Sequence, residues 1–141
     1  MSAEICRRCS TVEQCYEFML AYAAQGISSG DGSQSGARIR EVLQQAVDAL
    51  SGLADACATE VNADARESAE KYFAFLAVLE RDAENSIRTI ELVLAQPTIS
   101  SQLIDNLNAS MHLRAALTDL FLLSDIARIA RTSPAPSAVA G

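Results

Sequence analysis

Apolar side chains recur every three or four residues along almost the whole chain, and this spacing constrains the fold more than any other feature. On an α-helix such residues line one face, and that face must be buried against another element. The pattern occurs in four stretches, separated by turn-forming residues. The sequence therefore predicts an all-α protein.

The first two predicted helices cover residues 3–25 and 37–59. Ser10 with Glu13 forms a capping-box pattern that would start a shorter first helix, and Gly26 ends either version. Residues 27–36 contain three glycines and few apolar side chains, so they predict a mobile loop. The expected core stripes are Ile5, Cys9, Val12, Tyr16, Met19 and Ala23 in the first helix, and Ile39, Leu43, Ala46, Leu50, Leu53 and Cys57 in the second.

The third and fourth predicted helices cover residues 64–95 and 100–131. Asp64 with Glu67 reads as an N-cap, and Pro97 stops the third helix. Ser100 or Thr98 caps the fourth helix, and residues 132–141 are expected to be a disordered tail. The third stripe consists of Tyr72, Leu76, Leu79, Ala83, Ile87, Ile90 and Leu94.

Short loops place successive helices antiparallel, so the predicted architecture is a single up-down-up-down four-helix bundle over residues 1–131. The helices differ in length. At ~1.5 Å per residue, the first two would span roughly 35 Å and the last two roughly 46 Å. The longer pair must therefore bend or project beyond the shorter pair.

Charge and composition narrow the range of functions. The net charge is −7, which disfavours nucleic acid and favours a basic protein partner. No apolar run approaches the ~18 residues of a membrane span, and the N-terminus lacks an apolar signal core, so a cytoplasmic location is expected. All but one of the 11 basic residues are arginine, a composition typical of a GC-rich bacterial genome.

Four cysteines raise the question of a metal or redox site. Cys6, Cys9 and Cys15 are the candidate ligands, but their spacing fits no established zinc or iron–sulfur framework. Cys9 and Cys57 also fall on predicted core stripes, where a thiol acts as a small apolar group. Structural cysteines are therefore the favoured interpretation, and a metal- or redox-responsive protein remains an alternative.

The sequence lacks residues that the common catalytic sites of helical proteins require. His112 is the only histidine, so a Glu-x-x-His di-iron site cannot be built. Phosphotransfer through His112 is a further alternative, although no nearby lysine and glycine accompany it. We expect a non-enzymatic protein without a cofactor.

Surplus apolar surface points instead to protein binding. The segment from Tyr72 to Leu79 is apolar nearly all round, so it is either buried on several sides or meets a partner. On one continuous fourth helix, the core stripe would comprise Ile104, Leu107, Met111, Ala115, Leu122, Ile126 and Ile129. A second apolar face would lie opposite that stripe, formed by Leu113, Leu117, Leu120 and Phe121. Soluble monomers avoid large bare apolar patches, so this face predicts association, most simply as a homodimer, unless the first helix crosses over and covers it or the fourth helix bends. The predicted function is that of an adaptor, regulator, assembly factor or chaperone.

Overall fold

The computed structural model describes residues 1–29, 33–62 and 69–132, and it confirms the all-α prediction. Within these ranges there are six helices and no strand: α1 Ala3–Ala24, α2 Gln34–Leu50, α3 Leu53–Asn62, α4 Ala69–Leu94, α5 Ser101–Ala109 and α6 His112–Thr132. The predicted Asp64 and Glu67 cap, and the predicted tail beyond residue 132, lie outside the described residues.

The first helix has the longer of its two predicted forms. The Ser2 hydroxyl accepts a hydrogen bond from the backbone N–H of Ile5, so α1 begins at Ala3 and the start at Ser10 is wrong. Gly26 follows the last turn with a φ of 67°, a conformation that glycine adopts without steric cost.

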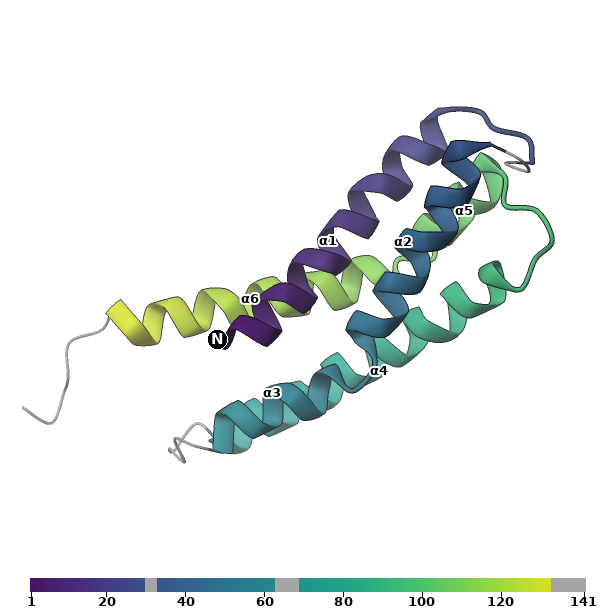
Figure 1. Ribbon diagram of the computed structural model, residues 1–141. Helices are drawn as coiled ribbons and strands as arrows, with labels where there is room; N and C mark the ends of the chain where they lie inside the picture. Colours follow the sequence, from purple (N-terminus) through teal and green to yellow (C-terminus); the bar gives the residue numbers. More distant parts are fainter. Residues whose placement is uncertain (30–32, 63–68, 133–141) are drawn as a thin grey trace, which may run out of the picture.

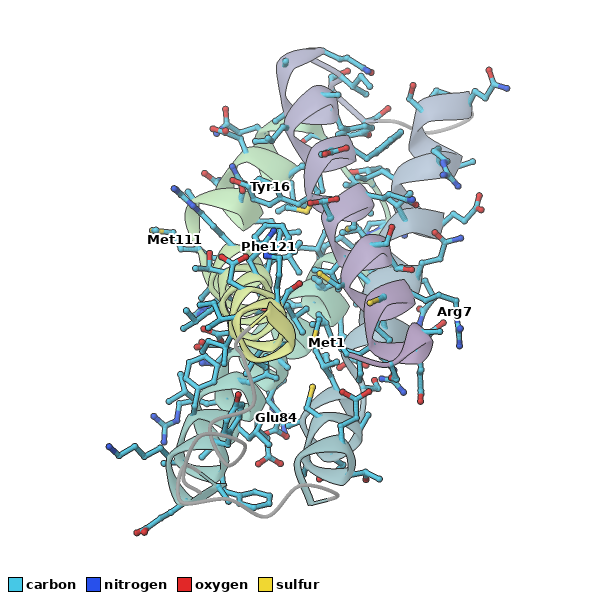
Figure 2. The ribbon with its side chains drawn as sticks, turned by 90° about the vertical axis from the view of Figure 1, so that its left-hand side faces the viewer. Met1, Arg7, Tyr16, Glu84, Met111 and Phe121 are labelled. Carbon is cyan, nitrogen blue, oxygen red and sulfur yellow. The ribbon has the colours of Figure 1, made fainter. Side chains whose placement is uncertain are left out.

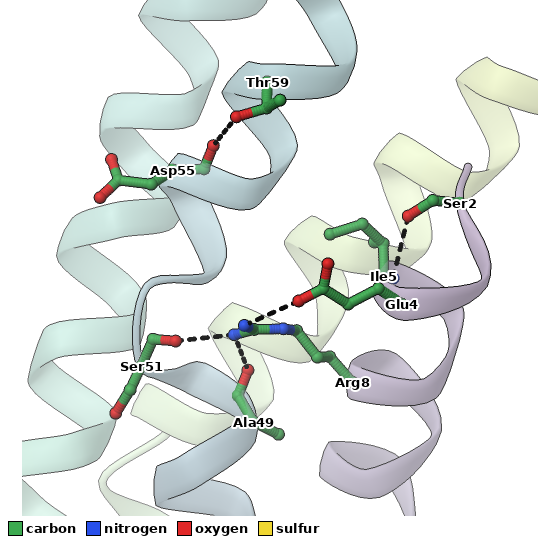
Figure 3. A network of polar contacts seen from close by, with 8 residues as sticks. All are labelled: Ser2, Glu4, Ile5, Arg8, Ala49, Ser51, Asp55 and Thr59. Carbon is green, nitrogen blue, oxygen red and sulfur yellow. Dashed lines mark hydrogen bonds and ion pairs between the residues drawn. The ribbon is translucent and has the colours of Figure 1, made fainter.

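The second predicted helix is two helices, α2 and α3. Ser33 caps α2, which begins three residues earlier than predicted, and Gly52 breaks the chain with a φ of 69°. Arg8 of α1 stabilises this break by donating from Nη1 to the carbonyls of Ala49, at 3.1 Å, and Ser51, at 2.7 Å (Figure 3). A residue distant in sequence thus satisfies carbonyl groups that the interrupted helix leaves without intrahelical donors.

The fourth predicted helix is also two helices, so the predicted count of four is wrong. Ser100 caps α5 as predicted, accepting from the N–H of Leu103 at 3.0 Å. Met111 then adopts a φ of 66°, the one positive φ at a residue other than glycine among the described residues. A left-handed residue cannot continue an α-helix, so α6 starts afresh at His112.

The helices pack side by side as Figure 1 shows. α1 lies along α2, α2 and α3 together pack against α4, and the chain returns through α5 against α1 and through α6 against α4. One apolar core results. All six residues of the predicted α2–α3 stripe are buried, as are Leu76, Leu79, Ala83 and Ile90 of the α4 stripe.

A buried polar cluster joins the first loop to the segment before α5. Tyr22 donates from its hydroxyl to the carbonyl of Ile99 at 2.5 Å, and Ser101 Oγ donates to the carbonyl of Tyr22 at 2.6 Å. Ser101 Oγ also accepts from the N–H of Ile27 at 2.8 Å. The start of the loop predicted to be mobile is therefore hydrogen-bonded to the bundle, while residues 30–32 lie outside the described part.

Arg40 performs a similar role at the end of α4. Its guanidinium donates to the carbonyls of Leu94, Gln96 and Pro97. The turn that Pro97 was predicted to impose is thus fixed by a side chain of α2. Among the described helices, none is both long and apolar enough to cross a bilayer.

Candidate functional site

The residues predicted to form an uncovered face on the fourth helix lie mostly in the core. Leu113, Leu117 and Leu120 are exposed by only 4%, 6% and 0%, whereas Phe121 is 42% exposed. The prediction that these residues share an outward face available to a partner is therefore wrong for the three leucines. One of the two alternative explanations, a bend in the fourth predicted helix, is present at Met111.

The physical reason is a change of helical phase. Ile104 and Leu107 of α5 are buried as predicted, but the left-handed residue at Met111 separates α6 from the α5 periodicity. Beyond the break, the stripe expected in the core turns outward and the opposite stripe turns inward. Met111 points away from the bundle in Figure 2, and Leu122 and Ile129 are 47% and 62% exposed.

The exposed residues Leu122 and Ile129 therefore lie on a different side of α6 from the face that was predicted to be exposed. α4 packs against α6 in the opposite direction (Figure 1) and carries exposed apolar side chains of its own. Asp82 of α4 meets Asp119 of α6, so Val78, one turn before Asp82, is level with Leu122, about one turn after Asp119. Val78 and Leu92 of α4 are both exposed. We call this surface the α4–α6 face; its exposed apolar members are Val78, Leu92, Met111, Leu122 and Ile129.

The contact between α4 and α6 contains a pair of carboxyl groups. Asp119 is half-buried, and its Oδ2 atom is fully buried without a hydrogen-bond partner among the described residues. Burial, a hydrogen bond with Asp82 and repulsion from the Asp82 charge raise the pKa of Asp119 to about 7. One proton shared between the two groups supplies the donor that two carboxylates lack.

Sequence analysis missed this pair. Asp119 lies one turn from Leu123 and Ala116, both in the α6 core. Its place at the edge of this core can be recognised only when it is known which side of α6 faces inward. Asp82 directly precedes Ala83 of the correctly predicted α4 stripe. The available signal was thus an acid flanking each stripe, which does not by itself show that the two acids meet.

The cysteines are distributed differently from a metal site. Cys6 is exposed, Cys9 half-buried, and Cys15 and Cys57 buried. Within the described ranges, no three His, Cys, Asp or Glu side chains converge as ligands. Burial raises the pKa of Cys15 to about 12 and that of Cys57 to about 11, which keeps both thiols neutral. Burial also raises the pKa of Cys9, assisted by the nearby Glu13.

His112 is the first residue of α6 and is half-buried. It therefore lies beside the Met111 break and near the end of the α4–α6 face, rather than in the middle of an exposed helix.

Comparison of the chain with protein family models, with curated proteins and with solved structures gives no match. The inference of function therefore depends on the geometry of the α4–α6 face and its carboxyl pair.

Proposed function

We propose that this protein is a non-catalytic helical module that binds protein through the α4–α6 face, and that the occupant of this face is a second copy of the chain. The observation that carries the proposal is the set of exposed apolar side chains on two adjoining helices, centred on Val78 and Leu122. Exposed apolar side chains that gather on one side of a soluble protein mark association sites.

Charge distribution supports a second copy as the occupant. The α4 helix carries five acids against three bases, whereas α6 carries three arginines against the two acids Asp119 and Asp125. In an isologous dimer, α4 of each copy can face α6 of the other, which brings opposite charges together around the apolar centre.

The proposed architecture is an up-down-up-down four-helix bundle in which the second and fourth segments are each broken into two helices. We place the protein in the bacterial cytoplasm, where its unpaired cysteines would remain reduced. In that setting, self-association would serve an adaptor, a regulator or an assembly factor.

Two double variants test the proposed interface. Val78→Glu with Leu122→Glu places four like charges across the two-fold interface, and we expect the mass in light scattering to fall by half with helicity unchanged. Leu20→Glu with Phe121→Glu is the matched control, because both residues are exposed but lie outside the α4–α6 face. A wild-type protein that remains monomeric at tens of micromolar contradicts self-association.

Salt dependence distinguishes a second copy from a basic partner. Each copy carries a net charge of −7, and this overall repulsion outweighs the attraction between the few opposite charges of α4 and α6, so screening should strengthen the dimer. Binding of a basic protein to this acidic chain should weaken as salt increases. Association that becomes weaker between low and high salt would therefore favour the basic partner.

A further inference from the structure

The carboxyl pair lies where it can control how α6 is held. α6 packs chiefly on α4, and its connection to α5 is the left-handed Met111. Asp82 of α4 and Asp119 of α6 face each other across this contact. A force between the two carboxyl groups therefore acts on the main packing contact of α6, close to a break in the helical backbone.

Among the residues that the structure describes, no base neutralises a doubly charged pair. Ser86 is buried one turn along α4, but its hydroxyl donates to the backbone carbonyl of Asp82 at 2.7 Å. The influences on Asp119 are burial and Asp82. Other ionisable groups on these elements are separately placed. On α1, Glu13 is half-buried beside Cys9, Arg8 is bonded to Ala49 and Ser51, and Glu4, Arg7 and Glu17 are exposed. On α4, Glu70, Lys71, Glu80, Arg81, Glu84, Arg88 and Glu91 are exposed, as is Asp105 on α5. The remaining charged or titratable groups of α6 are His112, Arg114, Asp125, Arg128 and Arg131.

We propose that Asp82 and Asp119 form a proton-dependent latch between α4 and α6, closed when the pair shares one proton and loosened when both carboxylates are charged. With one proton, a hydrogen bond between the two carboxyl groups links the helices. Without it, two negative charges face each other in a partly buried site, and α6 loosens about Met111. The latch is a property of the single chain and does not depend on self-association.

The direction of the pH effect follows from proton binding. The pKa of Asp119 is raised on folding, so the folded chain binds this proton more tightly than the unfolded chain does. The stabilisation is therefore complete below the ordinary aspartate pKa. It is lost as pH rises towards the folded-state pKa of about 7, and the contact between α4 and α6 is weakest above that value.

Asp119→Asn is the principal test, because asparagine keeps the shape and supplies a permanent donor to Asp82. We expect the variant to melt at a higher temperature than wild type at pH 8.5, and by a clearly smaller margin at pH 5, where only part of the stabilisation by the proton has been lost. Asp82→Asn should have the same effect, which keeps the test informative if one variant folds poorly. Asp105→Asn removes an exposed carboxylate from α5 and should follow the wild-type profile.

Carbon-13 NMR of the aspartate carboxyl carbons measures the proton directly. We expect one wild-type resonance, absent from the Asp119→Asn spectrum, to titrate near pH 7. Titration of every aspartate below about pH 5, in the ordinary range for this residue, would overturn the proposal. A difference in melting temperature between wild type and both asparagine variants that stays constant from pH 5 to 8.5 would also overturn it.

Discussion

Replacing Leu117 and, separately, Leu122 by alanine decides which face of α6 is inside. The two residues have the same chemistry and lie on opposite sides of the helix. Leu117 is 6% exposed and Leu122 is 47% exposed. A single continuous helix after residue 100 would reverse these environments, so the pair of variants tests the break at Met111.

The expected energies differ clearly. Leu117→Ala removes buried methyl groups and leaves a cavity, so it should lower the free energy of unfolding by roughly 2–5 kcal/mol. Leu122→Ala removes a side chain that is already about half in water, so its cost should stay below about 1 kcal/mol. With a urea m value of about 2 kcal/mol/M, Leu117→Ala should shift the unfolding midpoint by at least about 1 M.

Urea unfolding followed by circular dichroism is the assay. It is run at two protein concentrations, since coverage of Leu122 by a second copy would make the cost of its variant rise with concentration. If Leu122→Ala is the more destabilising variant at the lower concentration, α6 continues the phase of α5 and the packing described above is refuted.

Three further measurements test other parts of the bundle. Tyr22→Phe leaves the buried carbonyl of Ile99 without its donor, so the free energy of unfolding should fall by about 1–3 kcal/mol in urea titration; no change would remove the stabilising role of that bond. Cys6 should react rapidly with a thiol reagent at pH 8 while Cys15, with its pKa raised to about 12, reacts only on unfolding; equal rates would contradict the burial of Cys15. His112→Ala should change stability by no more than about 0.5 kcal/mol and leave association intact, and a larger thermal shift would make this residue structurally important.

The sequence alone determined where most of the helical segments lie and which side of three of them is buried. Helix geometry alone places apolar residues that are three or four positions apart on one face, so the stripes of α1, α2 and α4 could be predicted from the local sequence pattern. The α2 stripe is buried throughout, and in α1 the stripe shifts slightly, since Cys15 and Tyr22 are buried while Cys9 is half-buried. The buried Tyr22 finds its acceptor in Ile99, which the pattern could not identify.

Tertiary structure decided where the long segments break and therefore which face of α6 is inside. Gly52 offered a local signal for the first break, but methionine forms helices readily, and nothing in the sequence near Met111 predicts a φ of 66°. Once Met111 ends the phase of α5, the faces of α6 exchange, which moved the predicted partner-binding leucines into the core. The Asp82–Asp119 pair depends on the same fact, because two acids on separate helices meet only when the rotation and relative shift of both helices are fixed by packing.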